Sequence, residues 1–288
     1  MILEKLQLTV VKQLDNAVFE TQNQQGMVFY WIDHPKVKAL IAEQGAHLIS
    51  YRPSHGHELL WLSDDSQFSP SVAIRGGVPI CWPRFANVGD SPFPKHGLAR
   101  TATWQLANVN TTADECCLDF KLIPDSIPGI ELQCQFTLSQ NAHIQLSTHN
   151  HSSEPFYYTG ALHSYFITDV KKLHIRSLGQ QYFDSVAGVI TQVSGDFQLT
   201  KETDRIYLQA DDTSVMSDAD KQVEVSHQGH DSVVVWNPGS ALAAEMPDVS
   251  SADNFICIET AITQQAQCVA PGETHQLCQT ISSCTSTN

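Results

Sequence analysis

The sequence is poor in basic residues, with 16 lysines and arginines against 31 aspartates and glutamates and a formal net charge of -15. Nucleic acids and anionic membranes both require a basic face on a protein partner, so neither is expected to bind this chain. An acidic surface also repels anionic metabolites at long range. A small anionic ligand would therefore need a local basic pocket.

The sequence also lacks long apolar runs and recognisable cysteine patterns. No run approaches the roughly 18 apolar residues that a membrane-spanning helix needs. Residues 1–16 contain no basic segment followed by a sustained apolar core, so we expect no signal peptide. The eight cysteines form no CxxC pair and no metal-finger spacing. We therefore expect a cytoplasmic protein with reduced thiols rather than a disulfide framework.

Short β-rich runs recur along the whole chain, whereas helical periodicity is weak. The runs are rich in Val, Ile, Thr, Phe and Tyr and are separated by turn residues, which is typical of an all-β sandwich or barrel. Single helical turns are expected at residues 34–42 and 248–254. No linker, repeat or charge block interrupts the chain, so one domain is expected over residues 1–288, with a frayed polar tail at 282–288. The expected strands are 6–11, 27–32, 46–51, 59–62, 116–122, 130–138, 143–149, 172–175, 222–225, 232–236 and 255–260.

Three of the six arginines, Arg75, Arg84 and Arg100, lie within residues 75–100. A guanidinium group presents a fixed fork of donors that fits a phosphate or carboxylate. Two glycines follow Arg75 and let the backbone approach a ligand closely. Two prolines in the same segment withhold amide donors, so a central strand is not expected there. The segment therefore predicts a site for an anion. Arg84 either contributes to this site or covers the ring of Trp82.

Two ionisable residues lie in β-rich surroundings. His163 stands among aromatic and small residues, and Glu259 ends an apolar run. The ordinary alternatives are a core histidine bonded to a backbone carbonyl and a carboxylate that faces solvent at a strand end. If both side chains face one pocket, they form an acid–base pair that works near neutral pH.

Two further groups of polar residues are candidate sites. Asp204 precedes Arg205 and either forms a surface ion pair with it or accepts hydrogen bonds from ligand hydroxyls. His55 and His57 have HxH spacing, but Glu58 follows at once and no second cluster supplies ligands. A catalytic metal normally needs three or more spaced ligands, so neither a metal site nor a cupin-like metal oxygenase is expected.

Seven short segments, spread over about 200 residues, occur in the same order as in a known protein family. The most specific are RGGVPICWPRF at 75–85 and HGLAR at 96–100. With these segments the chain resembles the D-hexose-6-phosphate mutarotases (glucose-6-phosphate 1-epimerases), a branch of the aldose 1-epimerase family. The resemblance implies a large galactose-mutarotase-like β-sandwich, in agreement with the β-rich pattern. The other five segments are HELLWLS at 57–63, ALHSYF at 161–166, ETDRIY at 202–207, VWNP at 235–238 and IETA at 258–261.

The resemblance also implies roles for individual residues. Arg75 and Arg100 would hold the sugar phosphate, Asp204 would bind sugar hydroxyls, and His96 would face the ligand. Lys95 departs from the family pattern, in which a neutral polar residue is common, and it either strengthens phosphate binding or faces solvent.

For the reaction, the resemblance makes Glu259 the base and His163 the acid. They would interconvert the α and β anomers of a hexose 6-phosphate, with glucose 6-phosphate the leading candidate, by opening and closing the sugar ring without any cofactor. We expect the neighbouring carboxylate to favour the protonated imidazole. The alternatives are an aldose 1-epimerase for neutral sugars and a non-catalytic sugar-phosphate-binding protein, and the expected assembly is a monomer or weak homodimer.

Overall fold

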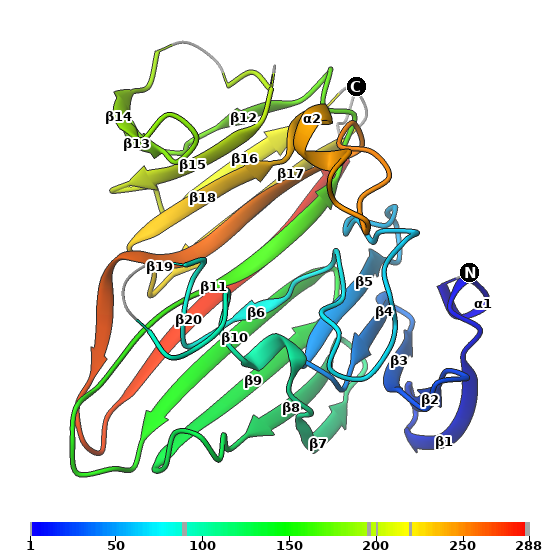
Figure 1. Ribbon diagram of the computed structural model, residues 1–288. Coiled ribbons are helices and arrows are strands. Elements are labelled where there is room, and N and C mark those ends of the chain that lie inside the picture. Colours follow the sequence, from blue (N-terminus) through cyan, green and yellow to red (C-terminus); the bar gives the residue numbers. More distant parts are fainter. Residues whose placement is uncertain (1, 88–90, 195–196, 200, 219–220, 286–288) are drawn as a thin grey trace.

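The computed structural model describes residues 2–87, 91–194, 197–199, 201–218 and 221–285, without the side chains of residues 284 and 285. Antiparallel strands dominate it, which confirms the all-β prediction (Figure 1). Within the described residues, helix is limited to α1 (Ile2–Lys5), α2 (Gly239–Ala243) and a 3-10 turn at Ala99–Thr101. No helix among these residues is long and apolar enough to cross a membrane.

The strands of the described residues form three sheets. The first sheet is a five-stranded meander, in which each strand pairs with the next along the chain. Its strands are β1 (Thr9–Asp15), β2 (Val18–Gln22), β3 (Val28–His34), β4 (Val37–Ala42) and β5 (His47–Pro53).

The second sheet contains eight strands. They are β7 (Gln105–Thr111), β8 (Cys116–Leu122), β9 (Ile130–Leu138), β10 (Asn141–Asn150), β12 (His174–Arg176), β16 (Thr213–Ser217), β17 (Lys221–Gln228) and β20 (Thr274–Thr285). Their order across the sheet is β12-β16-β17-β20-β10-β9-β8-β7.

The third sheet contains seven strands and carries the candidate site. They are β6 (Ile80–Cys81), β11 (Phe156–Ile167), β13 (Gln181–Asp184), β14 (Val189–Gln192), β15 (Thr203–Leu208), β18 (Ser232–Asn237) and β19 (Phe255–Val269). The order is β14-β13-β15-β18-β19-β11-β6, so β6 of the proline-containing segment lies at an edge, as expected.

Strand alternation places two kinds of side chain on opposite faces of β11 and β19. Leu162, Phe166, Ile256 and Ile258 belong to the main hydrophobic core. Because successive residues of a strand point to opposite faces, the residues between them face away from that core. His163, next to Leu162, therefore points to the other face, and the same alternation places Glu259 there.

The two expected helical turns are wrong. Residues 34–42 form the hairpin of β3 and β4. Val37, Ala39 and Ile41 of β4 pack in the main core, while Leu40 packs in a second cluster on the opposite face. A strand buried on both faces loses the alternation that identifies strands in a sequence. Residues 248–254 form turns and bends rather than a helix.

Candidate active site

His163 and Glu259 lie opposite each other in the antiparallel pair of β11 and β19. The distance from Nε2 of His163 to Oε1 of Glu259 is 3.2 Å. Both residues are buried, with 8% and 1% of their surfaces exposed. The pair that the sequence placed 96 positions apart in the chain (163 and 259) is thus brought within hydrogen-bonding distance by strand register.

Each member of this pair keeps one buried polar atom without a hydrogen-bond partner among the described residues. These atoms are Nδ1 of His163 and Oε2 of Glu259. Native structures pair almost all of their buried polar atoms, because an unpaired one costs free energy. Two such atoms in one contact pair indicate a site prepared for a ligand.

Aromatic rings surround His163. The ring of Tyr165 stacks on the imidazole at a centroid distance of 4.8 Å, and the edges of His96 and Trp236 approach at 5.7 and 6.1 Å. No role was assigned to Tyr165 or Trp236 from the sequence. The spacing of two residues between His163 and Tyr165 places both on one face of a strand and was the available signal.

Burial shifts both acid–base groups towards their neutral forms. The pKa of Glu259 lies well above its usual value because the carboxyl is desolvated, with a further contribution from Asp204. The pKa of His163 lies well below its usual value because of burial, with further contributions from His96 and from the positive charges of Arg75 and Arg100. The expectation that the carboxylate would favour the protonated imidazole is therefore wrong, since burial and neighbouring cations outweigh that attraction.

The guanidinium of Arg75 has two hydrogen-bond partners, one a carboxylate and the other a hydroxyl group. Its Nε donates to Asp248 at 3.0 Å, and its Nη1 donates to the hydroxyl of Tyr165, also at 3.0 Å. Burial opposes its charge, but Tyr165 and Asp248 raise its pKa overall. Tyr165 thus contacts both Arg75 and His163. Asp248 was missed by sequence analysis because no local pattern links it to an arginine 173 positions earlier.

Residues 95–100 supply three basic side chains, those of Lys95, His96 and Arg100. Arg100 Nη2 donates to the carbonyl of Lys95 at 3.2 Å, and Lys95 itself is exposed. Burial lowers the pKa of His96 to about 3, with contributions from Arg100, Lys95 and Arg75. The positive charges of Arg100, Lys95 and Arg75 therefore all act on His96, whose ring lies beside His163. The guanidinium of Arg84 instead donates from Nη1 to the carbonyl of Phe93.

Asp204 lies on β15, directly across from Trp236 of β18. Burial raises the pKa of Asp204, while a hydrogen bond from Ser185 and the charge of Lys95 oppose the shift. Asp204 in turn raises the pKa of Glu259. Asp204 therefore acts on Glu259, while Arg75, Arg100 and His96 act on His163.

The 55–58 segment has a different structural role. Glu58 accepts hydrogen bonds from Ser50 Oγ and from the backbone amides of Tyr51 and Leu60. His57 is exposed. No group of three His, Cys, Asp or Glu side chains that could hold a metal is found in the described part of the chain.

A buried polar network lies behind the pair, on the core face of β11 and β19. Ser164 donates to Gln279 Oε1, and Gln279 Nε2 donates to Thr260 at 2.8 Å. His227 contacts Thr260 at 2.7 Å and Ser214 at 3.0 Å. Satisfied buried networks of this kind specify a single arrangement of the strands that carry them. The network therefore fixes the strands on which His163 and Glu259 sit.

We expect Gly97→Ala to destabilise the protein by more than about 3 kcal/mol, beyond most point substitutions. Gly97 has a φ of +72°, and an added Cβ would lie 2.0 Å from the carbonyl oxygen of Trp82. Gly188 is the matched control, because it has a φ of +71° with no atom within 4 Å of an added Cβ. Gly188→Ala should cost only the left-handed backbone penalty of about 1–2 kcal/mol. Urea denaturation measures both, and equal losses would contradict the steric explanation.

Comparisons with known proteins bear on the chemistry of this site. The family model described as aldose 1-epimerase matches residues 28–282. A protein of Escherichia coli K12, provisionally named glucose-6-phosphate 1-epimerase, is 35% identical over 294 residues and covers 98% of each chain. The crystal structure of a provisionally named mutarotase from Salmonella typhimurium is similar with a TM-score of 0.92, 34% identity and 99% coverage of each chain.

A more distant structure shows the fold alone. It is a galactose mutarotase-like protein from Clostridium acetobutylicum with a TM-score of 0.69 and 13% identity, covering 94% of this chain and 100% of its own. The galactose-mutarotase-like β-sandwich expected from the sequence is confirmed.

Proposed function

Because the chain belongs to the aldose 1-epimerase family, we propose that it interconverts the α and β anomers of a hexose 6-phosphate, with glucose 6-phosphate as the leading substrate. Family membership makes the protein an epimerase of the isomerase class. The names of its relatives support a phosphorylated sugar. The observation that carries the proposal is the 3.2 Å contact of His163 with Glu259, in which each residue keeps an unpartnered buried atom.

The reaction needs one proton removed and one supplied at neighbouring oxygens. Glu259 accepts the proton of the C1 hydroxyl, and His163 donates a proton to the ring oxygen. The bond from C1 to the ring oxygen breaks and the aldehyde forms. After rotation about the C1–C2 bond, the same steps in reverse close the ring on the other face. Both oxygens are bonded to C1, so acid and base atoms must be close together, as the 3.2 Å separation allows.

The two residues together hold one proton throughout this cycle. When Glu259 is ionised, His163 is protonated, and when Glu259 is protonated, His163 is neutral. Burial favours the second arrangement in the free protein. Direct transfer along the 3.2 Å contact interconverts the two forms. The mechanism therefore uses only protons and requires no metal, nucleotide or redox cofactor.

We propose that Arg75 and Arg100 bind the phosphate, with Lys95 adding positive charge and Asp204 binding sugar hydroxyls. The contacts of Arg75 with Asp248 and Tyr165 occupy Nε and Nη1 and leave Nη2 to donate to a phosphate oxygen. These contacts also orient the guanidinium before the substrate arrives, which reduces the entropy lost on binding. A local cluster of cations in a chain of net charge -15 supports an anionic group on the substrate.

Alanine at Arg75 or Arg100 should weaken binding of glucose 6-phosphate about 10-fold or more, because hydrogen bonds to charged groups contribute about 1.5–3 kcal/mol. Calorimetric titration measures this affinity. Arg176→Ala is the matched control, since Arg176 is exposed on β12 and its removal changes the net charge equally. Normal binding by both the Arg75 and Arg100 variants would show that the phosphate lies elsewhere.

The proton inventory predicts a bell-shaped pH dependence of kcat/KM. At low pH, His163 takes up a proton while Glu259 still holds its own, so no base is available. This loss occurs below the pKa of His163, which lies under the usual 6.5 of histidine. At high pH, Glu259 loses its proton while His163 is neutral, so no acid is available. This loss occurs above the pKa of Glu259, which lies over the usual 4.5 of glutamate. Exchange rates measured by NMR across this range test the prediction. A profile without an acid limb would contradict the ionisation assigned to the pair.

We also propose a cytoplasmic enzyme. The seven cysteines that the structure describes in full are free thiols, which supports a reducing compartment. We further propose that the enzyme is a monomer or a weak homodimer.

A further inference from the structure

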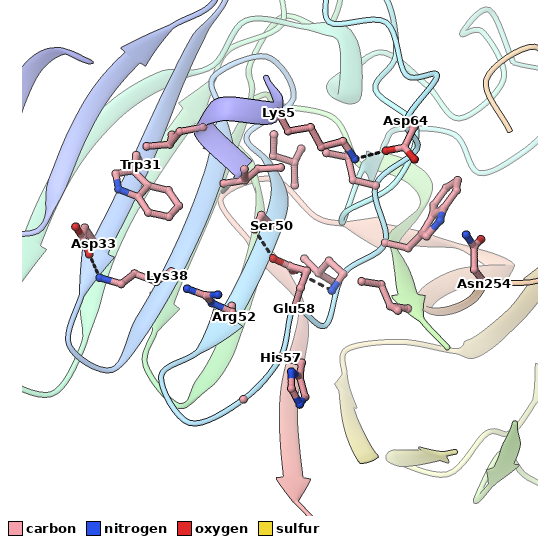
Figure 2. Close-up of a pocket in the computed structure, with 18 residues that line it drawn as sticks. Lys5, Trp31, Asp33, Lys38, Ser50, Arg52, His57, Glu58, Asp64 and Asn254 are labelled. Atoms are coloured by element: carbon pink, nitrogen blue, oxygen red, sulfur yellow. Dashed lines mark hydrogen bonds and ion pairs between the residues drawn. The ribbon is translucent and has the colours of Figure 1, made fainter. Parts of the chain in front are cut away.

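A cavity of about 740 Å³ lies apart from the candidate active site. It opens to solvent and is bounded by α1, one face of β3–β5 and the segment around residues 56–64 (Figure 2). Neither His163 nor Glu259 lines it. Its volume falls within the range of small-molecule sites, about 300–1,000 Å³.

The cavity has an apolar wall made of large side chains. Trp31, Ile49, Leu60 and Trp61 line it and are buried. The indole of Trp61 is fixed from behind, because it stacks on Phe255 at a centroid distance of 4.2 Å. A rigid apolar wall of this kind can bind the hydrocarbon part of a ligand. Its side chains are already fixed, so they lose little conformational entropy when the ligand binds.

Most of the charged groups that line the cavity are already paired. Lys5 contacts Asp64, and Lys38 contacts Asp33 (Figure 2). The carboxylate of Glu58 accepts three hydrogen bonds from within the chain. These groups therefore have little capacity left for a charged ligand.

Arg52 is the exception. Its exposed guanidinium lines the cavity and has no hydrogen bond or ion pair with any residue that the structure describes, although its charge also acts on Glu58. On the sheet it lies directly across from Lys38, so two basic side chains share one face. A guanidinium beside an apolar wall matches a carboxylate carried on a hydrocarbon body.

We propose that this cavity is a second ligand site, which binds a small amphipathic carboxylate. The hydrocarbon part lies on Trp31, Leu60 and Trp61, and Arg52 donates to the carboxylate. Trp61 of this wall also stacks on Tyr165 at a centroid distance of 5.8 Å, but neither His163 nor Glu259 lines the cavity, so the proposal does not depend on the proposed substrate.

Octanoate is a suitable probe, and isothermal titration calorimetry measures its binding to the full chain. We expect binding by the wild type, a loss of about 10-fold or more in affinity for Arg52→Ala, and no change for the control Arg176→Ala. Arg52→Glu should lose octanoate and bind octylammonium instead. The double variant His163→Gln, Glu259→Gln should keep octanoate affinity, because the cavity excludes both residues.

Three results would overturn the proposal. The first is no measurable binding of octanoate by a wild-type protein that folds normally by circular dichroism. The second is an Arg52→Ala affinity equal to that of Arg176→Ala. The third is binding of 1-octanol as tight as that of octanoate, which would remove the role of the charge.

Discussion

Replacing Glu259 with glutamine should reduce the exchange of glucose 6-phosphate anomers by about 10²–10⁴-fold, the usual contribution of a positioned acid or base. Glutamine keeps the size of the side chain and can still hydrogen-bond to His163, but it cannot accept the proton of the C1 hydroxyl. Binding of the sugar phosphate should persist, because Arg75 and Arg100 are untouched. Two-dimensional exchange NMR measures the rate and calorimetry measures the affinity.

Stability separates this loss from misfolding. The folded-state pKa of Glu259 is raised, so the folded protein binds more protons than the unfolded chain as the pH rises above 4.5, and its stability falls over that range. Glutamine removes this ionisation. At pH 7 the variant should therefore resist urea at least as well as the wild type. A stable variant that still exchanges anomers at the wild-type rate would exclude Glu259 as the base.

Replacing His163 with glutamine should reduce exchange to a similar extent, because the ring oxygen loses its proton donor. The two residues act on one proton, so the double variant with Glu259→Gln should be no slower than the slower single variant. His174→Gln is the control for the substitution itself, since His174 is exposed on β12. Losses that multiply in the double variant would mean that the residues act independently, against the shared-proton mechanism.

Strands with one buried and one exposed face carry the clearest sequence signal. Residues 116–122 and 130–138 were expected as strands and form β8 and β9. Their burial alternates along the chain, which is the signal that sequence analysis uses. Residues 59–62 were also expected as a strand, but only Leu60 and Leu62 form isolated bridges. A short apolar run does not reveal whether a partner strand is available.

The residues of the candidate site were found through motifs, while their environment was not. His163 and Glu259 are each weak signals alone, and strand register brings them together. The second partner of Arg75, Asp248, comes from a distant turn. The predicted direction of the pKa shift of His163 was wrong because the shift depends on burial and on His96, Arg75 and Arg100, which only the folded chain brings into reach.

The rate of anomer exchange for glucose 6-phosphate, compared with that for glucose under the same conditions, tests the central claim most directly. NMR exchange between the α and β signals measures both rates with and without the protein. We predict strong acceleration for the phosphate ester and little for glucose, because Arg75 and Arg100 contact only the former. No acceleration of glucose 6-phosphate exchange would contradict the proposed activity, and equal acceleration of both sugars would contradict the phosphate site.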